Sequence, residues 1–406
     1  MKGVTEAYRA LCDVYIRGSY VGEAVKAHSL SACPAALRLV YGTIEHHYLY
    51  EYRLGKLSEK SPKTAVAILL KMGMYLIDFM DDIPNQVAVN EIVRTAKNAG
   101  KAQLAGFINA VLRRYAESGK DILPTDAIER LSVDSNRPIW LVKRYIGECG
   151  KEKALEILST KGSVKTHVRP SRAFGKDALR RYLEENAIEF VETPYGFLLS
   201  KVGRLASLFG EGKATVMSLG SLEICDAVPE VKGDILDMCA APGGKAVYLA
   251  ERTEGRIIAC DLHPHRVELI RAYAERMKVR NIELRVADHT IYDPSLKERF
   301  SVVLLDAPCS GLGTLASNPD VILHRAEADL DEIIRTQKAL LENASKYMKE
   351  GGTLVYSTCS DLPSENEEMV KDFLLSHPEM RLAREKSMRT DTSGGEGYYY
   401  AVLEKK

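Results

Sequence analysis

Apolar residues in the first third of the chain recur at the spacing of amphipathic helices. In the stretch "KAQLAGFINAVLRRY", residues 101–115, they fall at i, i+3, i+4, i+7, i+8 and i+11, which is one face of a helix. This face consists of Leu104, Phe107, Ile108, Val111, Leu112 and Tyr115. Helix-compatible patterns also occur at residues 6–15, 35–54 and 63–79. Turn signals separate them at residues 17–19, 61–62 and 83–85. The pattern predicts a compact helical bundle over residues 1–134.

From about residue 230, short apolar runs alternate with helical stretches. The runs are "DILDMC", "RIIACDL", "IELRVAD", "SVVLLDAP" and "TLVYSTC". This alternation predicts a parallel sheet with helices on both faces, and "VVLLD" is typical of a strand buried on both sides. The C-terminal "YYYAVLEKK" predicts a last strand, antiparallel at the edge of the sheet. Residues 216–406 are therefore predicted to form an α/β Rossmann-like domain.

The segment between these two regions has a mixed pattern. "VKTHVRP" predicts a strand, "GKDALRRYLEEN" a helix, and "AIEFVETPYGFLLS" further strands. Residues 135–215 are therefore predicted to form a small mixed α/β domain. The fold class is multidomain: a helical bundle, a small α+β region and an α/β domain.

Composition narrows the class of protein. The 406 residues are 46% hydrophobic and 28% charged, which is typical of a globular protein. The longest apolar stretch, residues 64–80, contains Lys71 and Asp78 and is too short to span a bilayer, and no signal peptide precedes it. The eight cysteines include no C-x-x-C pair, and the nine histidines form no ligand pattern. We expect a cytoplasmic protein with reduced thiols, without metal.

Charge is distributed unevenly along the chain. Residues 1–200 carry 29 basic and 23 acidic side chains, although the whole chain is formally neutral. Five basic residues cluster near the end of the bundle: Arg94, Lys97, Lys101, Arg113 and Arg114. They form either a solvated face or a surface for phosphate groups.

The stretch "DMCAAPGGKA", residues 237–246, lies where the first parallel strand ends and a helix begins. A P-loop would need glycine in place of Cys239 and a hydroxyl residue in place of Ala246, and no G-x-G-x-x-G pattern is present. Ligands of open parallel sheets bind at the carboxyl ends of the strands. The stretch therefore predicts a cofactor-binding turn, with an ordinary tight turn as the alternative.

Acidic residues and cysteines follow the next strands. Asp261, Asp288 and Asp306 lie at three successive strand ends, where carboxylates can accept ribose hydroxyls. Cys309 comes three residues after Asp306, and Cys359 ends the fifth strand. Thiols at such positions are candidate nucleophiles.

The segments "DMCAAPGGK", "LLDAPCSGLG" and "LVYSTCS", in this order over residues 230–406, resemble RsmB/Sun-type RNA cytosine-5 methyltransferases, which use S-adenosylmethionine. The helical region, above all "GFINAVLRRY", resembles the NusB-like RNA-binding domain of the bacterial small-subunit rRNA branch. The resemblance implies a cofactor site lined by Cys239, Ala240, Ala241, Pro242, Gly243, Gly244, Lys245, Asp261, Arg266, Asp288 and Asp306. The chain departs from the family pattern at residues 217–221 and 169–171, which bears on local substrate contacts and not on the cofactor site.

The resemblance also implies a mechanism. Cys359 would add to carbon 6 of a cytosine, Cys309 would assist its release, and Asp306 would hydrogen-bond the base. The related DNA enzymes use the cysteine of the Pro-Cys pair as nucleophile, so sequence alone leaves the two roles exchangeable. The expected substrate is small-subunit (16S) rRNA, free or partly assembled, bound by a monomer. The alternatives are the same chemistry on tRNA, or a non-catalytic RNA-binding assembly factor.

Overall fold

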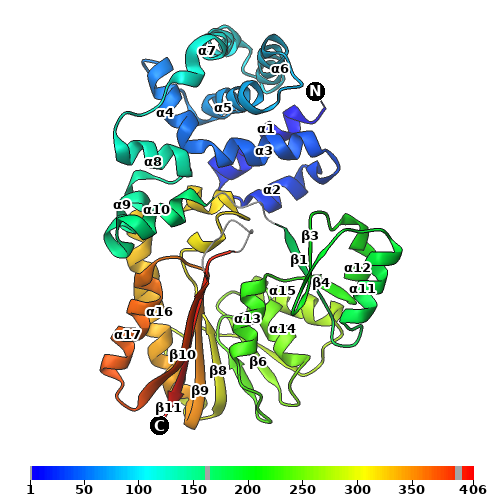
Figure 1. Cartoon of the computed structure of the whole chain (residues 1–406), viewed down its shortest axis with the longest axis vertical. Helices are drawn as coiled ribbons and strands as arrows, with labels where there is room; N and C mark the ends of the chain where they lie inside the picture. The colour runs from blue at the N-terminus through cyan, green and yellow to red at the C-terminus, as the bar shows by residue number, and fades with distance from the viewer. Residues whose placement is uncertain (1, 161–164, 389–395) are drawn as a thin grey trace. The chain divides into compact units, whose positions relative to one another are not determined.

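The computed structural model describes residues 2–160, 165–388 and 396–406 (Figure 1). Contacts divide the chain into two compact units. Unit 1 contains Met1–Thr160 together with Asn318–Ala326, and unit 2 contains Lys161–Ser317 together with Glu327–Lys406. No helix in the described parts of the chain is long and apolar enough to cross a membrane.

Unit 1 is a bundle of helices around one central helix. Its helices are α1 (Val4–Arg17), α2 (Val21–Ala27), α3 (Pro34–Glu45), α4 (His47–Leu57), α5 (Thr64–Phe79), α6 (Asn85–Asn98), α7 (Ala105–Ser118), α8 (Ala127–Ser135), α9 (Ile139–Cys149) and α10 (Lys151–Ser159). Every position of α5 from Val66 to Ile77 is buried. A helix that is apolar on all sides lies in the core, and α5 contacts α1, α3, α4, α6 and α7 there.

Two predictions for this bundle need correction, and some of its helices were missed. The helix predicted over residues 35–54 is two helices, because the backbone leaves the helical conformation at His46 (φ −116°, ψ 23°). Phe107, predicted on the buried face of α7, is 39% exposed. The side of α7 that packs on the core is formed by Ile108, Val111 and Leu112. The helices α2 and α6 were not predicted at all.

Residues 135–216 divide differently between the two units than the sequence pattern suggests. Helices α9 and α10 belong to unit 1. In unit 2, β1 (Thr166–Pro170), β2 (Val191–Thr193), β3 (Gly196–Leu199) and β4 (Ala214–Val216) form an antiparallel sheet of order β2-β3-β1-β4. The sheet is accompanied by α11 (Lys176–Glu185) and α12 (Ala206–Gly210). The division into domains at 134 and 215 stays a prediction.

The remainder of unit 2 is built on a seven-stranded sheet of order β10-β11-β9-β8-β5-β6-β7. Its strands are β5 (Ile235–Asp237), β6 (Ile257–Asp261), β7 (Ile282–Val286), β8 (Phe300–Asp306), β9 (Met348–Thr358), β10 (Met380–Met388) and β11 (Tyr398–Lys405). The strands β5 to β9 are parallel, and β10 and β11 are antiparallel. The prediction that the last strand forms the edge is wrong, because β10 pairs outside it.

Helices cover both faces of this sheet (Figure 1). On one face, α16 (Glu327–Tyr347) and α17 (Glu367–Ser376) pack on residues such as Leu236, Val303 and Leu354. On the other, α13 (Leu219–Ala227), α14 (Gly244–Ala250) and α15 (Pro264–Arg276) pack on their neighbours Ile235, Val302 and Val355. Successive residues of one strand thus enter different cores, which explains the continuous apolar runs.

Candidate active site

The turn after β5 approaches α15 closely. Gly243 has φ +109°, a conformation that favours glycine, and it is the residue before α14. A Cβ atom at this position would lie 3.1 Å from the Cα of Ile270. Glycine is therefore required here by both conformation and space, so the turn is built for close backbone approach.

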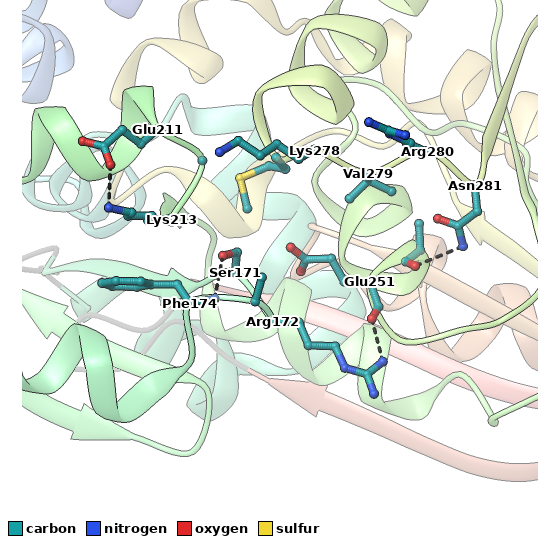
Figure 2. A pocket seen from close by; sticks show the side chains of 14 residues that line it. Ser171, Arg172, Phe174, Glu211, Lys213, Glu251, Lys278, Val279, Arg280 and Asn281 are labelled. Atoms are coloured by element: carbon teal, nitrogen blue, oxygen red, sulfur yellow. Dashed lines mark hydrogen bonds and ion pairs between the residues drawn. The ribbon is translucent and has the colours of Figure 1, made fainter.

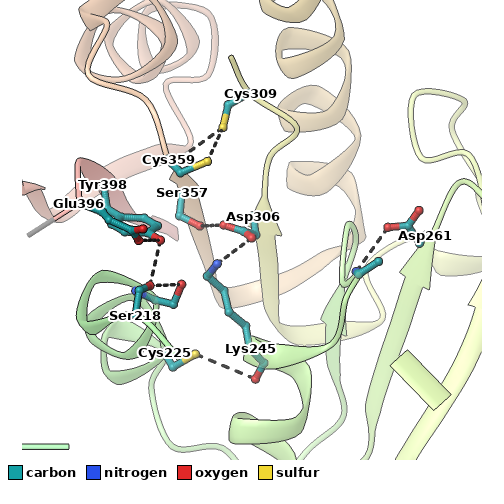
Figure 3. A network of polar contacts seen from close by, with 12 residues as sticks. Ser218, Cys225, Lys245, Asp261, Asp306, Cys309, Ser357, Cys359, Glu396 and Tyr398 are labelled. Carbon is teal, nitrogen blue, oxygen red and sulfur yellow. Dashed lines mark hydrogen bonds and ion pairs between the residues drawn. The ribbon is translucent and has the colours of Figure 1, made fainter. Parts of the chain in front are cut away.

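Asp261, at the end of β6, is joined to this turn. Its Oδ2 accepts a hydrogen bond from the backbone N–H of Ala241 at 3.3 Å (Figure 3). Its Oδ1 accepts one from the N–H of His263 at 3.3 Å. Arg266 pairs with Asp261 at 3.5 Å and donates to the carbonyl of Ala241 at 3.3 Å. A carboxylate oxygen accepts more than one hydrogen bond, so Asp261 keeps acceptor capacity for ribose hydroxyls. These residues fit the nucleoside-bearing cofactor expected from the sequence.

Asp288 lies two residues beyond β7 and is exposed. Its Oδ1 accepts hydrogen bonds from the N–H and hydroxyl of Thr290, at 3.0 and 2.5 Å. The carboxylate is thus held near the same strand edge, but no described contact joins it to Asp261 or Asp306.

Asp306, at the end of β8, is held from two sides. The ammonium of Lys245 lies 2.7 Å from its Oδ2, and the hydroxyl of Ser357 donates to its Oδ1 at 2.8 Å (Figure 3). Burial lowers the pKa of Lys245, but the charge of Asp306 outweighs it and keeps the pKa above its usual value. Lys245 was predicted to line the cofactor site as part of the turn at 239–245. In the structure its ammonium group forms an ion pair with Asp306. No sequence pattern singled out Ser357.

Asp237 is a further acidic group at this edge, which the sequence reading did not single out. It ends β5 and is fully buried. Burial, reinforced by the charge of Asp306, raises its pKa to about 8. A carboxyl group in this setting is protonated near neutral pH.

The two candidate cysteines lie together. The Sγ atoms of Cys309 and Cys359 are 3.1 Å apart, and the N–H of Cys359 donates to the Sγ of Cys309 at 3.3 Å (Figure 3). The hydrogen bond to Cys359, with burial, raises the pKa of the Cys309 thiol well above its usual value. The thiol of Cys309 is therefore held in its protonated form. Burial also raises the pKa values of Cys225 and Cys260, each to about 12, as expected for inert thiols.

A buried carboxylate joins the two loops that carry these cysteines. Glu365 accepts hydrogen bonds from the N–H of Ser310 at 2.8 Å and from its hydroxyl at 2.5 Å. It also accepts from the hydroxyl of Ser360 and, at 3.0 Å, from the amide of Gln337. Ser310 follows Cys309 and Ser360 follows Cys359, so one side chain fixes both loops. The sequence reading missed this residue.

The two departures from the family pattern have structural partners. Ser218 caps α13 through the N–H of Ser221 and donates to the hydroxyl of Tyr398 at 2.9 Å. Arg169 is buried, pairs with Glu251 at 2.6 Å and lies over the ring of Tyr248. The residues at both departures from the family pattern therefore contact other residues of unit 2.

Comparisons with known proteins agree with this architecture. The family described as 16S rRNA methyltransferase RsmB/F matches residues 227–403, and the NusB family matches residues 5–117. A probable ribosomal RNA small subunit methyltransferase B of Bacillus subtilis is 30% identical over 87% of this chain and 83% of its own length. Its counterpart in Synechocystis is 31% identical over 92% and 89%.

Solved structures show the same fold. The crystal structure of PH0851 superposes with a TM-score of 0.83 at 23% identity, covering 100% of this chain and 98% of that one. NSun6 from Pyrococcus horikoshii with SFG superposes with a TM-score of 0.57 at 19% identity, covering 67% and 99%. With the family match and the two bacterial relatives, the chain belongs to the RsmB/F family of S-adenosylmethionine-dependent 16S rRNA methyltransferases.

Proposed function

We propose that this protein methylates carbon 5 of a cytosine in small-subunit rRNA through a covalent adduct with Cys359. The observation that supports this chemistry is the pair of thiols, 3.1 Å apart, at the strand edge that also holds Asp306. One thiol would form the covalent bond to the base. A second, protonated thiol is needed only because that bond must be broken again after methylation.

The mechanism begins at Cys359. Its thiolate bonds to carbon 6, and the electron pair displaced from the carbon 5–carbon 6 double bond makes carbon 5 nucleophilic. The thiol of Cys309, which keeps its proton, donates a hydrogen bond that stabilises the thiolate of Cys359 before addition. S-adenosylmethionine supplies the electrophilic methyl group that carbon 5 attacks.

Release completes the reaction. After methylation, carbon 5 loses its proton to a water molecule, the double bond re-forms and the sulfur of Cys359 leaves carbon 6 with the bonding electrons. Cys309 donates a hydrogen bond to this departing sulfur. Asp306, held by Lys245 and Ser357, hydrogen-bonds the base and favours its protonated form as electron density shifts into the ring.

The helical unit would supply most of the affinity for RNA. Arg94, Lys97, Arg113 and Arg114 are exposed, and Lys101 is partly exposed. Phe107 and Arg114 are seven residues apart on α7 and therefore share a face of the helix, where an exposed ring can stack on a base. The target cytosine must be unstacked to reach Cys359, which favours a looped segment of rRNA. We propose that the substrate is free or partly assembled rRNA in the cytoplasm and that the protein binds it as a monomer.

The test is transfer of a tritiated methyl group from S-adenosylmethionine to purified rRNA, followed by bisulfite mapping of the modified base. We expect 5-methylcytosine in 16S rRNA. Incorporation into tRNA alone would show that the protein carries out the same reaction on tRNA and not on rRNA. Cofactor binding without incorporation into any RNA would contradict the proposal and favour a non-catalytic assembly factor.

A further inference from the structure

Unit 2 contains a cavity of about 750 Å³ away from the thiols (Figure 2). One wall is formed by residues 171–174 and 211–213 of the small sheet region, and the other by residues 250–251 and 277–281 at the ends of α14 and α15. Both helices begin at the carboxyl ends of the parallel strands and end at the opposite edge. For a five-residue strand such as β6, the two edges are roughly 15–20 Å apart. The cavity is therefore separate from the site that holds Cys359.

Positive charge exceeds negative charge in this cavity. Its lining includes Arg172, Lys213, Lys278 and Arg280 on the basic side and Glu211 and Glu251 on the acidic side. Both carboxylates have basic partners. Lys213 lies 2.6 Å from Glu211, and Arg169, from behind the wall, lies 2.6 Å from Glu251.

Three basic side chains keep their charge available. No carboxylate among the described residues forms an ion pair with Arg172, Lys278 or Arg280. Arg172 donates to the main-chain carbonyl of Glu251 at 2.7 Å, a contact that orients the guanidinium without neutralising it (Figure 2). All three are exposed. The lining therefore carries three cations without a direct ion-pair partner among the described residues, and Lys278 and Arg172 interact with the carboxylates of Glu211 and Glu251 only from a longer range.

The two walls are held at a fixed separation. Arg276, at the end of α15, donates to the carbonyl of Phe209 at 2.9 Å and to the hydroxyl of Thr215 at 3.1 Å. Gly212 has φ +69°, and a Cβ there would lie 1.9 Å from the carbonyl oxygen of Arg276. Only glycine permits this approach. The backbone positions that carry the basic groups are thus fixed before any ligand binds, which lowers the entropic cost of binding.

We propose that this cavity binds backbone phosphates of an rRNA segment that flanks the target cytosine. The inference rests on the proposed function, because it takes rRNA as the substrate. Uncompensated lysine and arginine side chains on a fixed surface are the chemistry that contacts phosphodiesters. Since the cavity is at the far edge of the sheet, it adds affinity and register without touching the reacting base.

The test uses the full-length protein with the double substitution Lys278→Glu and Arg280→Glu. Each phosphate contact on single-stranded RNA contributes about 0.7 to the slope of log affinity against log salt, so losing two contacts lowers the slope by about 1.4. Between about 50 and about 200 mM salt, wild type should then lose about sevenfold more affinity for a 16S rRNA transcript than the variant. The neutral pair Lys278→Gln and Arg280→Gln should shift the slope in the same direction.

The matched control is Lys349→Glu with Lys371→Glu, which makes the same charge change at exposed lysines of unit 2 outside the cavity. An equal effect of control and cavity variants would overturn the inference, because it would show a general charge effect. Unchanged RNA binding in the cavity variants would also overturn the inference. This holds even if calorimetry shows that the variants no longer bind inorganic phosphate, because the cavity would then bind phosphate without binding RNA. Cofactor affinity should be unchanged throughout. Methyl transfer by wild type reports separately on the proposed function.

Discussion

At the residue scale, the two active-site thiols have different environments, and this difference predicts different failures. Cys359→Ala cannot form the adduct and should be inactive, leaving RNA unlinked. Cys309→Ala can add to the base and transfer methyl, but it lacks the group that assists release. It should therefore accumulate an enzyme–RNA species that survives denaturing electrophoresis.

The control for this pair is Cys33→Ala, a half-buried cysteine of unit 1, which should trap nothing and keep wild-type activity. If the covalent species forms with Cys359→Ala and not with Cys309→Ala, the roles are reversed, as in the DNA enzymes.

Glu365 is predicted to act as a positioning residue for both cysteines. In Glu365→Gln, one carboxylate oxygen becomes an NH₂ group that faces the donors on Ser310 or Ser360, which leaves buried donors unpaired. The cost is about 1–3 kcal/mol, and we expect kcat to fall roughly 5- to 150-fold with little change in cofactor affinity.

Adduct formation separates this role from a loss of stability. Combined with Cys309→Ala, Glu365→Gln should slow the appearance of the covalent species, while Glu368→Gln, an exposed neighbour, should not. A lower melting temperature with an unchanged rate of adduct formation would assign Glu365 a structural role only.

The raised pKa of Asp237 predicts a dependence of stability on pH. The folded state holds the proton more tightly than the unfolded state, in which a carboxyl group has its usual pKa near 4. This contribution is complete below about pH 4 and is lost as pH rises through about 8. Between about pH 6 and about pH 9, wild type should lose about 1–3 kcal/mol relative to Asp237→Asn, measured by denaturant unfolding. Asp331→Asn, at an exposed site, should track wild type.

Candidate site residues could be singled out from the sequence where they share a motif, but not where only the fold brings them together. Cys309, Asp306 and the turn at 239–245 stand in recognisable segments. Glu365 and Ser310 are 55 residues apart and become a unit only when the loops after β8 and β9 meet. No local pattern marks a carboxylate whose partners lie on other loops.

At the scale of helices and strands, elements with an apolar periodicity were predicted, and those without one were missed. The strand β10 is exposed along most of its length, and its sequence "MRLAREKSM" has no alternation, so its pairing with β11 was not visible. The break at His46 was missed for the opposite reason. Apolar residues recur through residues 35–54 at spacings compatible with one helix, and nothing in the pattern marks the end of α3 at Glu45.

The crossing of α3 and α5 depends on Gly42. A Cβ at this position would lie 2.0 Å from the Tyr75 ring, so in Gly42→Ala this buried ring must leave its place in the core. Overpacking of this kind costs about 1–3 kcal/mol. Gly147→Ala in α9, where nothing lies within 4 Å, should instead stabilise by about 0.5–1 kcal/mol because alanine favours helix. Denaturant unfolding measures both, and a neutral Gly42→Ala would contradict this packing.

At the scale of the whole molecule, the chain does not divide at one point. Residues 318–326 lie in the sequence between β8 and α16 of unit 2, yet they belong to unit 1. Ile322 is buried, and Asp320 Oδ2 accepts a hydrogen bond from the N–H of Val21, the first residue of α2, at 2.7 Å. A sequence reading that assigns domains as continuous ranges cannot find such a segment, because it follows the loop that carries Cys309 without a break in the pattern.

This contact predicts that Asp320, from the C-terminal half of the sequence, stabilises α2 near the N-terminus. Asp320→Ala removes the acceptor at the start of α2, and the loss of a helix-capping acceptor costs about 0.5–2 kcal/mol. Hydrogen exchange of the α2 amides should accelerate about fivefold, the ratio that corresponds to about 1 kcal/mol. Cofactor affinity should not change, since Asp320 lies outside unit 2. Asp331→Ala, exposed on α16, is the matched control and should leave exchange in α2 as it is in wild type. Unaltered protection of α2 in Asp320→Ala would show that the segment rests on unit 1 without stabilising it.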